Sequence, residues 1–250
     1  MIVSRVYPGH AESIDLDDAA SRDALLELYR PESPSTVRVN LIASVTGNAG
    51  GVDGTSHSLS NPVDRRILGV IRELADVVLI GAESIRQEGN LVPRRTPLAI
   101  VTGSGDLGDH GIDPSIEPGR ILVFCPSSAR ADVERSLAGA AAEVIVLPAT
   151  DAVIAPEAIV TALRVRGYES IVCEGGPLLA ARLTDAGLVD ELCLSTSPVL
   201  GGAAIPLAGT TARPETSAVL TQLLVDDSGA TYARWSVLTE PQSAAPLATD

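Results

Sequence analysis

The Glu-Gly-Gly-Pro stretch at 174–177 is the clearest candidate for chemistry, because it lies where an apolar run meets a helical pattern, in IVCEGGPLLAARL. Glycines let a ligand approach the backbone closely, and proline suits the first position of a helix. The unpaired N–H groups in the first turn of a helix bind anions such as pyrophosphate. The stretch therefore indicates an anion site, although a tight turn between strand and helix would have the same sequence.

Two other apolar runs end in polar residues that could bind phosphate. Gly81 closes the run VVLI, and Ser84 and Arg86 follow it, so that a hydroxyl and a guanidinium become candidate phosphate ligands. In VTGSG, Thr102 and Ser104 place two hydroxyls at another strand end, where they could hold a ribose phosphate. An ordinary turn and a solvated surface arginine remain the alternatives.

Asp64 is the carboxylate with the most chemical interest. Asn61 is a plausible N-cap and Pro62 fits the first helical position, so Asp64 would lie in the first turn of a helix. It could simply complete a capping box and offset the helix dipole there. If it faces a pocket, it could instead bind the amidine-like edge of a pterin or pyrimidine through two parallel hydrogen bonds.

The residue types exclude several reaction classes. All 18 basic residues are arginine, so Walker-type phosphate loops, Schiff bases and lysine bases are excluded. The cysteines and histidines have neither metal-ligand nor disulfide-framework spacing, and the cysteines are interpreted as buried packing residues. These residues are Cys125, Cys173, Cys193, His10, His57 and His110. A metal site and a histidine-centred triad are not expected.

Composition predicts a soluble protein with a small-molecule partner. The chain has 250 residues, is 45% hydrophobic and carries a net charge of −14, which disfavours nucleic acid because phosphate binding needs a basic face. Aromatic residues make up only 2%, too few for a stacking platform. No apolar run is long enough for a membrane span, and acids occupy the N-terminal region where a signal peptide would be apolar. A cytoplasmic location is expected.

Strand and helix patterns alternate along the chain and predict an α/β fold with a mostly parallel sheet covered on both faces. Strands are predicted at 37–45, 77–80, 98–105 including a turn, 120–127 including a turn, 142–148, 170–173 and 190–200. Helices are predicted from 62 onward and at 129–142, 156–166 and 177–186. The segments 219–226 and 231–238 predict a C-terminal hairpin, which makes the sheet mixed.

The organisation predicted is one domain with two appendages. Residues 1–36 are interpreted as an N-terminal extension with a short helix at 24–29, residues 37–240 as the domain, and residues 241–250 as a flexible tail. The glycine-rich stretch TGNAGGVDGTS after the first strand of the domain is predicted to be a loop.

Two blocks carry a family resemblance: LRVRGYESIVCEGGPLLAARLTDAGLVDELCLSTSPVLGG and RELADVVLIGAESIR. Together they resemble the pyrimidine reductase family of riboflavin biosynthesis, over about two hundred residues from position 37 to the final hairpin. The resemblance implies a three-layer sandwich like that of dihydrofolate reductase, with NADPH as cofactor and a homodimer as assembly. The zinc signature H-x-E with P-C-x-x-C of the companion deaminase domain does not occur in these residues, so a reductase without deaminase activity is expected.

The resemblance also implies how NADPH is held. The turn after the glycine pair would cradle its phosphates, a second loop would follow the strand at 77–80, a third would lie near the adenosine phosphate, and two residues would flank the nicotinamide. Arg86 is added for its capacity to bind phosphate. The cofactor residues predicted are Ala43, Thr46, Gly81, Ser84, Arg86, Thr102, Ser104, Glu174, Gly175, Gly176, Pro177 and Leu178.

On the substrate side the resemblance is mixed. The predicted substrate residues are Ser44, Asp64, Arg65, Leu91 and Arg94, with the two arginines matching phosphate contacts. The family pattern A-S-x-D-G-K is ASVTGN here, and the loop that commonly contains Asp-Pro is EGNLVPR. These departures leave two substrates open.

The predicted activity is hydride transfer from NADPH to a C=N or carbonyl group of a pyrimidine, as in 5-amino-6-(5-phosphoribosylamino)uracil reductase. A dihydrofolate or dihydropterin reductase anchored by Asp64 is the first alternative, and a nucleotide-binding paralogue without turnover is the second. Where a proton is needed, a water near Asp64 or Ser44 is the predicted source, so these two are the candidate catalytic residues.

Overall fold

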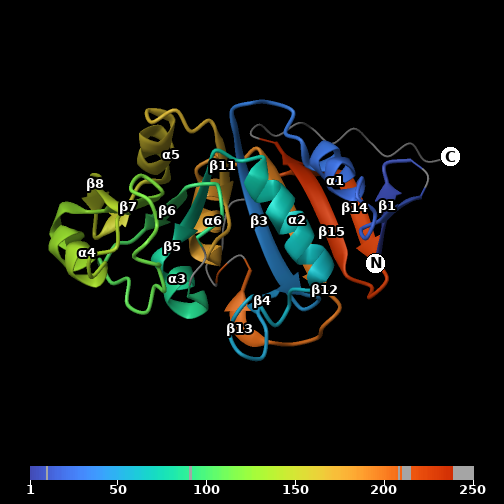
Figure 1. Ribbon diagram of the computed structural model, residues 1–250, viewed down its shortest axis with the longest axis horizontal. Coiled ribbons are helices and arrows are strands. Elements are labelled where there is room, and N and C mark those ends of the chain that lie inside the picture. Colours follow the sequence, from blue (N-terminus) through green and yellow to red (C-terminus); the bar gives the residue numbers. More distant parts are fainter. Residues whose placement is uncertain (10, 90–91, 208, 210–214, 239–250) are drawn as a thin grey trace.

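The structure is a computed structural model that describes residues 1–9, 11–89, 92–207, 209 and 215–238. Among these residues, eleven strands form one sheet in the order β2-β1-β14-β15-β12-β3-β11-β5-β6-β7-β8 (Figure 1). The strands are β1 (Ile2–Tyr7), β2 (Glu12–Asp15), β3 (Thr36–Ser44), β5 (Val77–Gly81), β6 (Leu98–Val101), β7 (Ile121–Cys125), β8 (Glu143–Val146), β11 (Ser170–Cys173), β12 (Glu191–Ser197), β14 (Ala218–Asp226) and β15 (Thr231–Val237). From β12 to β8 all neighbours are parallel, and from β12 to β2 all are antiparallel.

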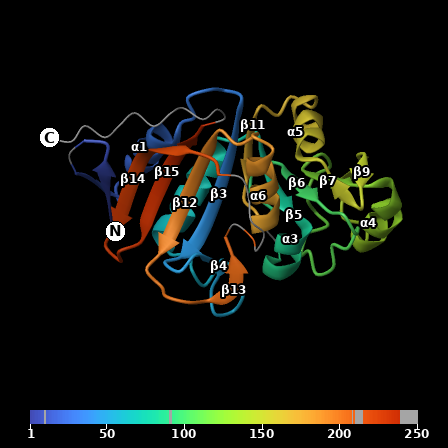
Figure 2. The same ribbon diagram turned by 180° about the vertical axis from the view of Figure 1, so that it is seen from behind.

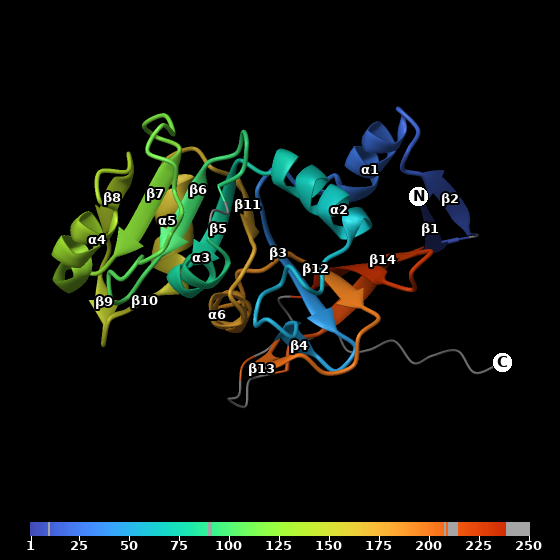
Figure 3. The same cartoon turned by 60° about the horizontal axis from the view of Figure 1, so that its bottom comes forward.

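Helices cover both faces of the sheet, so the fold is the predicted three-layer sandwich with a C-terminal hairpin. The helices are α1 (Ser21–Tyr29), α2 (Pro62–Glu73), α3 (Ala82–Glu88), α4 (Arg130–Ser136), α5 (Pro156–Arg164) and α6 (Pro177–Asp185). The first four pack on one face and α5 and α6 on the other (Figures 2 and 3). Alternation along β5 explains the two cores, because Val78 and Ile80 face the first four helices while Val77 and Leu79 face the last two.

Local signals place α2 as predicted. The Asn61 side chain accepts a hydrogen bond from the Asp64 backbone N–H at 2.9 Å, which caps the helix. The Asn61 amide also donates to Asp226 at 2.7 Å, and the Tyr232 hydroxyl donates to the same carboxylate at 2.7 Å. The first turn of α2 is therefore fixed to the C-terminal hairpin, and this holds Asp64 in one place.

Three features differ from the sequence analysis, and the first of them depends on a distant partner. Residues Asn48–Gly50 form β4 inside the predicted loop and pair with β13 (Ala203–Pro206). The predicted helix at 129–142 is a 3₁₀ turn, Ser127–Ala129, followed by the short α4, because Ala138 and Gly139 adopt positive φ and reverse the chain. A second small sheet pairs β9 (Ala149–Thr150) with β10 (Val153–Ile154).

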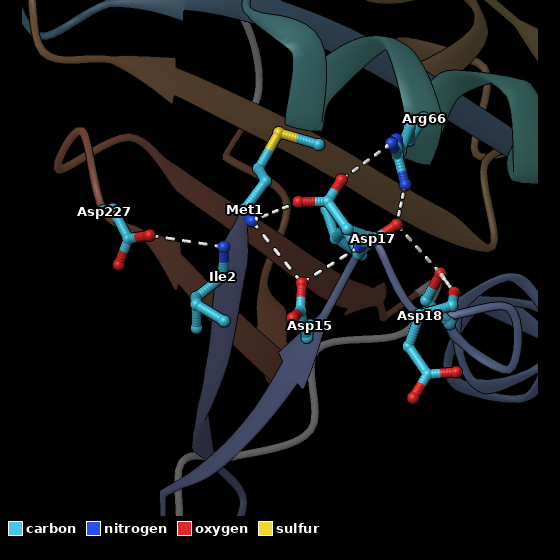
Figure 4. Close-up of polar contacts among 9 residues, drawn as sticks. Met1, Ile2, Asp15, Asp17, Asp18, Arg66 and Asp227 are labelled. Atoms are coloured by element: carbon cyan, nitrogen blue, oxygen red, sulfur yellow. Dashed lines mark hydrogen bonds and ion pairs between the residues drawn. The ribbon is translucent and has the colours of Figure 1, made fainter.

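The N-terminal segment is joined to the sheet more closely than an appendage would be. Strand β1 pairs with β14 and β2, and α1 packs beside α2. Figure 4 shows the Met1 amine bound to Asp15 and Asp17, at 3.4 and 2.7 Å. Arg66 of α2 contacts Asp17 at 3.4 Å and donates to the Leu16 carbonyl, so the segment is tied to the helix that carries Asp64. The predicted tail at 241–250 lies outside the described residues.

The three cysteines are buried and unpaired, which confirms their interpretation as packing residues. Burial raises the pKa of Cys173 to about 12 and that of Cys193 to about 11, so both stay neutral thiols. No helix among the residues described is long and apolar enough to cross a membrane.

A buried charge cluster joins the parallel and antiparallel halves of the sheet. Arg38 of β3 contacts Glu191 of β12 at 2.6 Å and donates to the Tyr29 carbonyl at the end of α1. Arg234 of β15 binds the other oxygen of Glu191 and donates to the Leu28 carbonyl at 3.0 Å. The side chains of Arg38 and Glu191 are only 6% and 10% exposed, so two arginines share one carboxylate away from water.

Replacing that carboxylate should be costly. Glu191→Gln leaves two buried guanidinium groups without a negative partner, and we expect the free energy of unfolding to fall by about 3–5 kcal/mol. Urea titration followed by circular dichroism measures this. The control is Glu134→Gln, which breaks an exposed pair with Arg130 and should cost about 1 kcal/mol or less. Equal losses in the two variants would contradict the buried role.

Candidate functional site

The ends of β5 and β11 are joined by direct contact between their backbones. The Gly81 N–H donates to the Gly175 carbonyl at 2.8 Å. Gly175 has φ +93°, which disfavours any residue with a side chain, and a Cβ there would lie 3.1 Å from Leu41. Gly176, joined to Gly175 by a cis peptide bond, is the N-cap of α6, and a Cβ on it would lie 3.2 Å from the Ser84 hydroxyl. Side chains are disfavoured here by the backbone conformation of Gly175 and by these tight contacts.

Two cavities meet at this turn. The larger, about 650 Å³, lies along α6 and is called the α6 cavity. The smaller, about 410 Å³, lies along α2 and is called the α2 cavity. Both are lined by Ser84, Gln87, Gly176, Pro177 and Ile205. Ligands in the two cavities would therefore be in contact with each other beside the glycine turn.

The α6 cavity collects most of the residues predicted to bind the cofactor. Those on its wall are Gly81, Ser84, Arg86, Thr102, Ser104, Gly176, Pro177 and Leu178. No side chain caps α6, Pro177 has no N–H, and the N–H groups of Leu179 and Ala180 donate to the Gly176 carbonyl at 3.0 and 3.2 Å. Among the residues described, the Leu178 N–H makes no hydrogen bond and remains for a ligand. Val101, Ile154 and Ile159 give the same cavity an apolar wall. Three strand ends and one helix start thus converge, as expected for the carboxyl edge of a parallel sheet.

The α2 cavity contains the predicted substrate residues of α2. Asp64 lines it, and its carboxylate accepts a hydrogen bond from the Ser60 hydroxyl at 2.7 Å. Arg65 lines it as well and is exposed, and its guanidinium makes no hydrogen bond or ion pair to any residue that the structure describes. A fixed carboxylate and a partner-free guanidinium are therefore presented to the same space. This pair could bind a ligand with both donor groups and an anionic group.

Arg72 is a site residue that the sequence analysis missed. It forms a two-point ion pair with Glu174, with distances of 2.7 and 2.6 Å, on the wall of the α2 cavity. Burial alone would lower the pKa of Arg72, but the hydrogen bonds and charge of Glu174, with a contribution from Glu88, raise that pKa above its ordinary value. Asp64 and Arg72 lie eight residues apart on α2, so helical spacing could have placed them on one face.

Glu174, predicted among the cofactor residues, thus lies on the α2 cavity and uses its carboxylate on Arg72. The pair crosses from α2 to the residue before the glycine turn. It therefore ties the glycine turn to α2. The side chains of Arg72 and Glu174 are only 21% and 9% exposed.

Several predicted residues are not brought to either cavity. Ala43 is buried near the end of β3, and Ser44 is bonded to the Thr46 hydroxyl at 3.0 Å and to the Asn48 backbone N–H at 3.2 Å. Thr46 in turn accepts from the Gly201 N–H at 3.0 Å, so this group fixes the loop between β3 and β4. It is Asn40, Leu41 and Ile42 of β3 that line the α2 cavity instead.

The second predicted arginine is also away from the cavities. Arg94 is exposed, and its carbonyl accepts a hydrogen bond from Arg120 at 3.2 Å. Leu91 lies outside the described residues. Of the phosphate-contacting arginines predicted for the substrate, Arg65 is the one on a cavity wall. Among the residues described, no group of three or more histidine, cysteine or acidic side chains could hold a metal ion.

Comparison with protein families shows where the chain belongs. The profile of the RibD C-terminal domain matches residues 35–231. The chain belongs to the RibD C-terminal domain family. Comparison with curated proteins gives no sequence match.

Solved structures share the fold of this RibD C-terminal domain. A pyrimidine reductase-like protein from Corynebacterium diphtheriae is 22% identical with a TM-score of 0.71, over 86% of this chain and 98% of that one. Rib7, a riboflavin biosynthesis reductase from Saccharomyces cerevisiae, is 14% identical with a TM-score of 0.61, over 86% and 98%. RibD from Acinetobacter baumannii is 16% identical with a TM-score of 0.63, and this chain covers 58% of it.

The glycine turn predicts a contrast between two neighbouring alanine variants. Gly175→Ala places a side chain at φ +93° and should lower the free energy of unfolding by about 1–3 kcal/mol. Gly81→Ala has φ −81° and ordinary contacts at 3.6 Å, so it should change stability by about 1 kcal/mol or less. Urea titrations of both variants test this. Equal stability of the two would show that the turn does not require glycine.

Proposed function

We propose that this protein is an NADPH-dependent reductase that transfers hydride to a pyrimidine, in the manner of 5-amino-6-(5-phosphoribosylamino)uracil reductase. The observation that carries the proposal is the meeting of two cavities at Gly176 and Pro177. A hydride transfer needs donor and acceptor in contact while each is held by its own site. Membership of the RibD C-terminal domain family supports the reaction class.

The α6 cavity fits a dinucleotide. It combines a glycine turn open to close approach, the free Leu178 N–H at the start of α6 and an apolar wall suited to a nucleobase. The first turn of α6 would hold the diphosphate, and Ser84 stands at the boundary between the cavities. NADPH, when bound, supplies hydride from its nicotinamide ring. The other predicted cofactor residues on the wall of the α6 cavity would complete the NADPH site.

The chain's own contribution is to position and to exclude water. Leu41, Ile205 and Pro177 line the α2 cavity and place apolar surface around its contents. Asp64, oriented by Ser60, can hold donor groups of a ring or a water that delivers a proton. Of the two candidate catalytic residues, Asp64 is the one on the cavity wall, so we assign it the proton-handling role.

A second candidate substrate is a dihydropterin. One observation favours it, which is the balance of charge on the wall of the α2 cavity. Three acids lie there, Asp64, Glu88 and Glu174. Arg65 is the one arginine of that wall whose guanidinium has no partner among the described residues. An amidine-like edge pairs well with a carboxylate, whereas a phosphorylated substrate needs the guanidinium. The homodimer stays a prediction from the family resemblance.

Turnover distinguishes a reductase from a paralogue that only binds nucleotide. With NADPH and a panel of phosphoribosylaminopyrimidines and dihydropterins, we expect loss of the reduced nicotinamide absorbance with at least one substrate. Mixtures without protein and mixtures without substrate are the controls. NADPH binding with no oxidation across the panel would favour the non-catalytic paralogue.

Two variants separate the candidate substrates. Asp64→Asn keeps the bond to Ser60 and removes the charge. It should abolish turnover of a pterin, which the carboxylate would anchor, whereas with a phosphorylated pyrimidine it should lower kcat through loss of the proton-handling group and leave KM unchanged. Arg65→Ala should raise KM for the phosphorylated pyrimidine about 10- to 100-fold and leave a pterin unaffected. Steady-state kinetics, with kcat and KM measured for both variants and both substrates, test these expectations. If neither variant alters either substrate, the α2 cavity is not the substrate site.

A further inference from the structure

The Arg182 guanidinium has no partner among the described residues, although Arg182 belongs to a cavity wall. Four arginines line the two cavities: Arg65, Arg72, Arg86 and Arg182. Arg72 is held by Glu174, and Arg86 donates to the Asp106 carbonyl at 2.7 Å. The Arg182 guanidinium makes no hydrogen bond or ion pair to any residue that the structure describes, although its side chain is half-buried.

A guanidinium that no residue of the protein holds keeps all its N–H donors available to a ligand that supplies acceptors. The acid on the wall of the α6 cavity is Glu83, which is exposed and accepts a hydrogen bond from Gln87 at 3.3 Å. The α6 cavity therefore has two arginines and one acid on its wall, in a protein with a net charge of −14. An anionic group of the ligand is the partner that this chemistry selects.

The position of Arg182 separates it from the anion site at the start of α6. It follows Pro177 by five residues, which along an α-helix is about 7 Å. The space beside it is bounded by Pro156 and Ile159 of α5, which contacts α6. A ligand that fills the cavity would carry one anionic group at the first turn of α6, an apolar part along the wall, and a second anionic group near Arg182.

We propose that Arg182 binds the phosphate on the 2′-oxygen of the adenosine ribose and so makes the α6 cavity select NADPH over NADH. The proposal rests on the proposed function, because it takes the α6 cavity as the dinucleotide site. Ser104 lies on the same wall, and its hydroxyl can donate a hydrogen bond while its oxygen accepts from the Asp106 N–H at 3.2 Å. A guanidinium matches a phosphate monoester with two parallel N–H bonds, and NADH has no such group.

The test is the binding selectivity of Arg182→Ala. We expect its Kd for NADPH to rise about 10- to 100-fold, while its Kd for NADH stays unchanged. The same contrast should appear with 2′,5′-ADP and 5′-AMP, measured by calorimetry. Arg182→Lys keeps the positive charge and loses the two parallel N–H donors of the guanidinium. Its Kd for NADPH should lie between those of Arg182→Ala and the unmodified protein.

Arg164→Ala is the matched control. Arg164 is exposed at the end of the adjacent helix α5, has no partner among the described residues and lines neither cavity, so its replacement should leave both affinities unchanged. Circular dichroism and urea titration verify that each variant is folded.

The outcomes separate the two proposals. Equal weakening of NADPH and NADH by Arg182→Ala would place the guanidinium on a group common to both and overturn the inference alone. Unchanged binding of both, with turnover intact, would also overturn it alone. If the unmodified protein binds neither dinucleotide, the proposed function fails and the inference fails with it.

Discussion

The close approach of two strand ends determines where ligands can lie in this protein. The hydrogen bond from the Gly81 N–H to the Gly175 carbonyl brings β5 and β11 together at the carboxyl edge of the sheet. Gly175 has a positive φ that favours glycine, and a Cβ on either Gly175 or Gly176 would be in tight contact with a neighbouring side chain. The same turn starts α6, so the helix N-terminus and both cavities share one boundary. Any shift of this turn would move the two sites relative to each other.

Charge is distributed differently on the two sides of the turn. In the α2 cavity, Arg72 is neutralised by Glu174, and the Asp64 carboxylate is held by a hydroxyl, which leaves a site able to recognise donor groups. Each cavity has two arginines on its wall, but the α6 cavity has one acid, Glu83, where the α2 cavity has three. The α6 cavity also has the free Leu178 N–H at the start of α6. This asymmetry is consistent with an anionic dinucleotide on one side and a polar ring on the other, and it arises although the whole chain is strongly acidic.

Local sequence signals predicted the parts of the site that depend on neighbours in the chain. The cap of α2 at Asn61, the strand β11 and the start of α6 at Pro177 each follow from a few adjacent residues, and the structure has all three. The pairing of β4 with β13 and the docking of β1 on β14 could not be predicted, because the partner strands are more than a hundred residues away. Arg72 was missed for a similar reason, since its role depends on Glu174 from another element. The resemblance placed the substrate near Ser44, whereas the cavity lies beside Asn40, Leu41 and Ile42.

The most direct test of the central claim is a crystal structure of the protein with NADPH and a substrate analogue. The account predicts the diphosphate at the first turn of α6, and the reactive carbon of the nicotinamide beside Gly176, about 3–3.5 Å from the atom of the analogue that would accept hydride. A dinucleotide bound elsewhere, or a nicotinamide separated from the α2 cavity by the glycine turn, would contradict it.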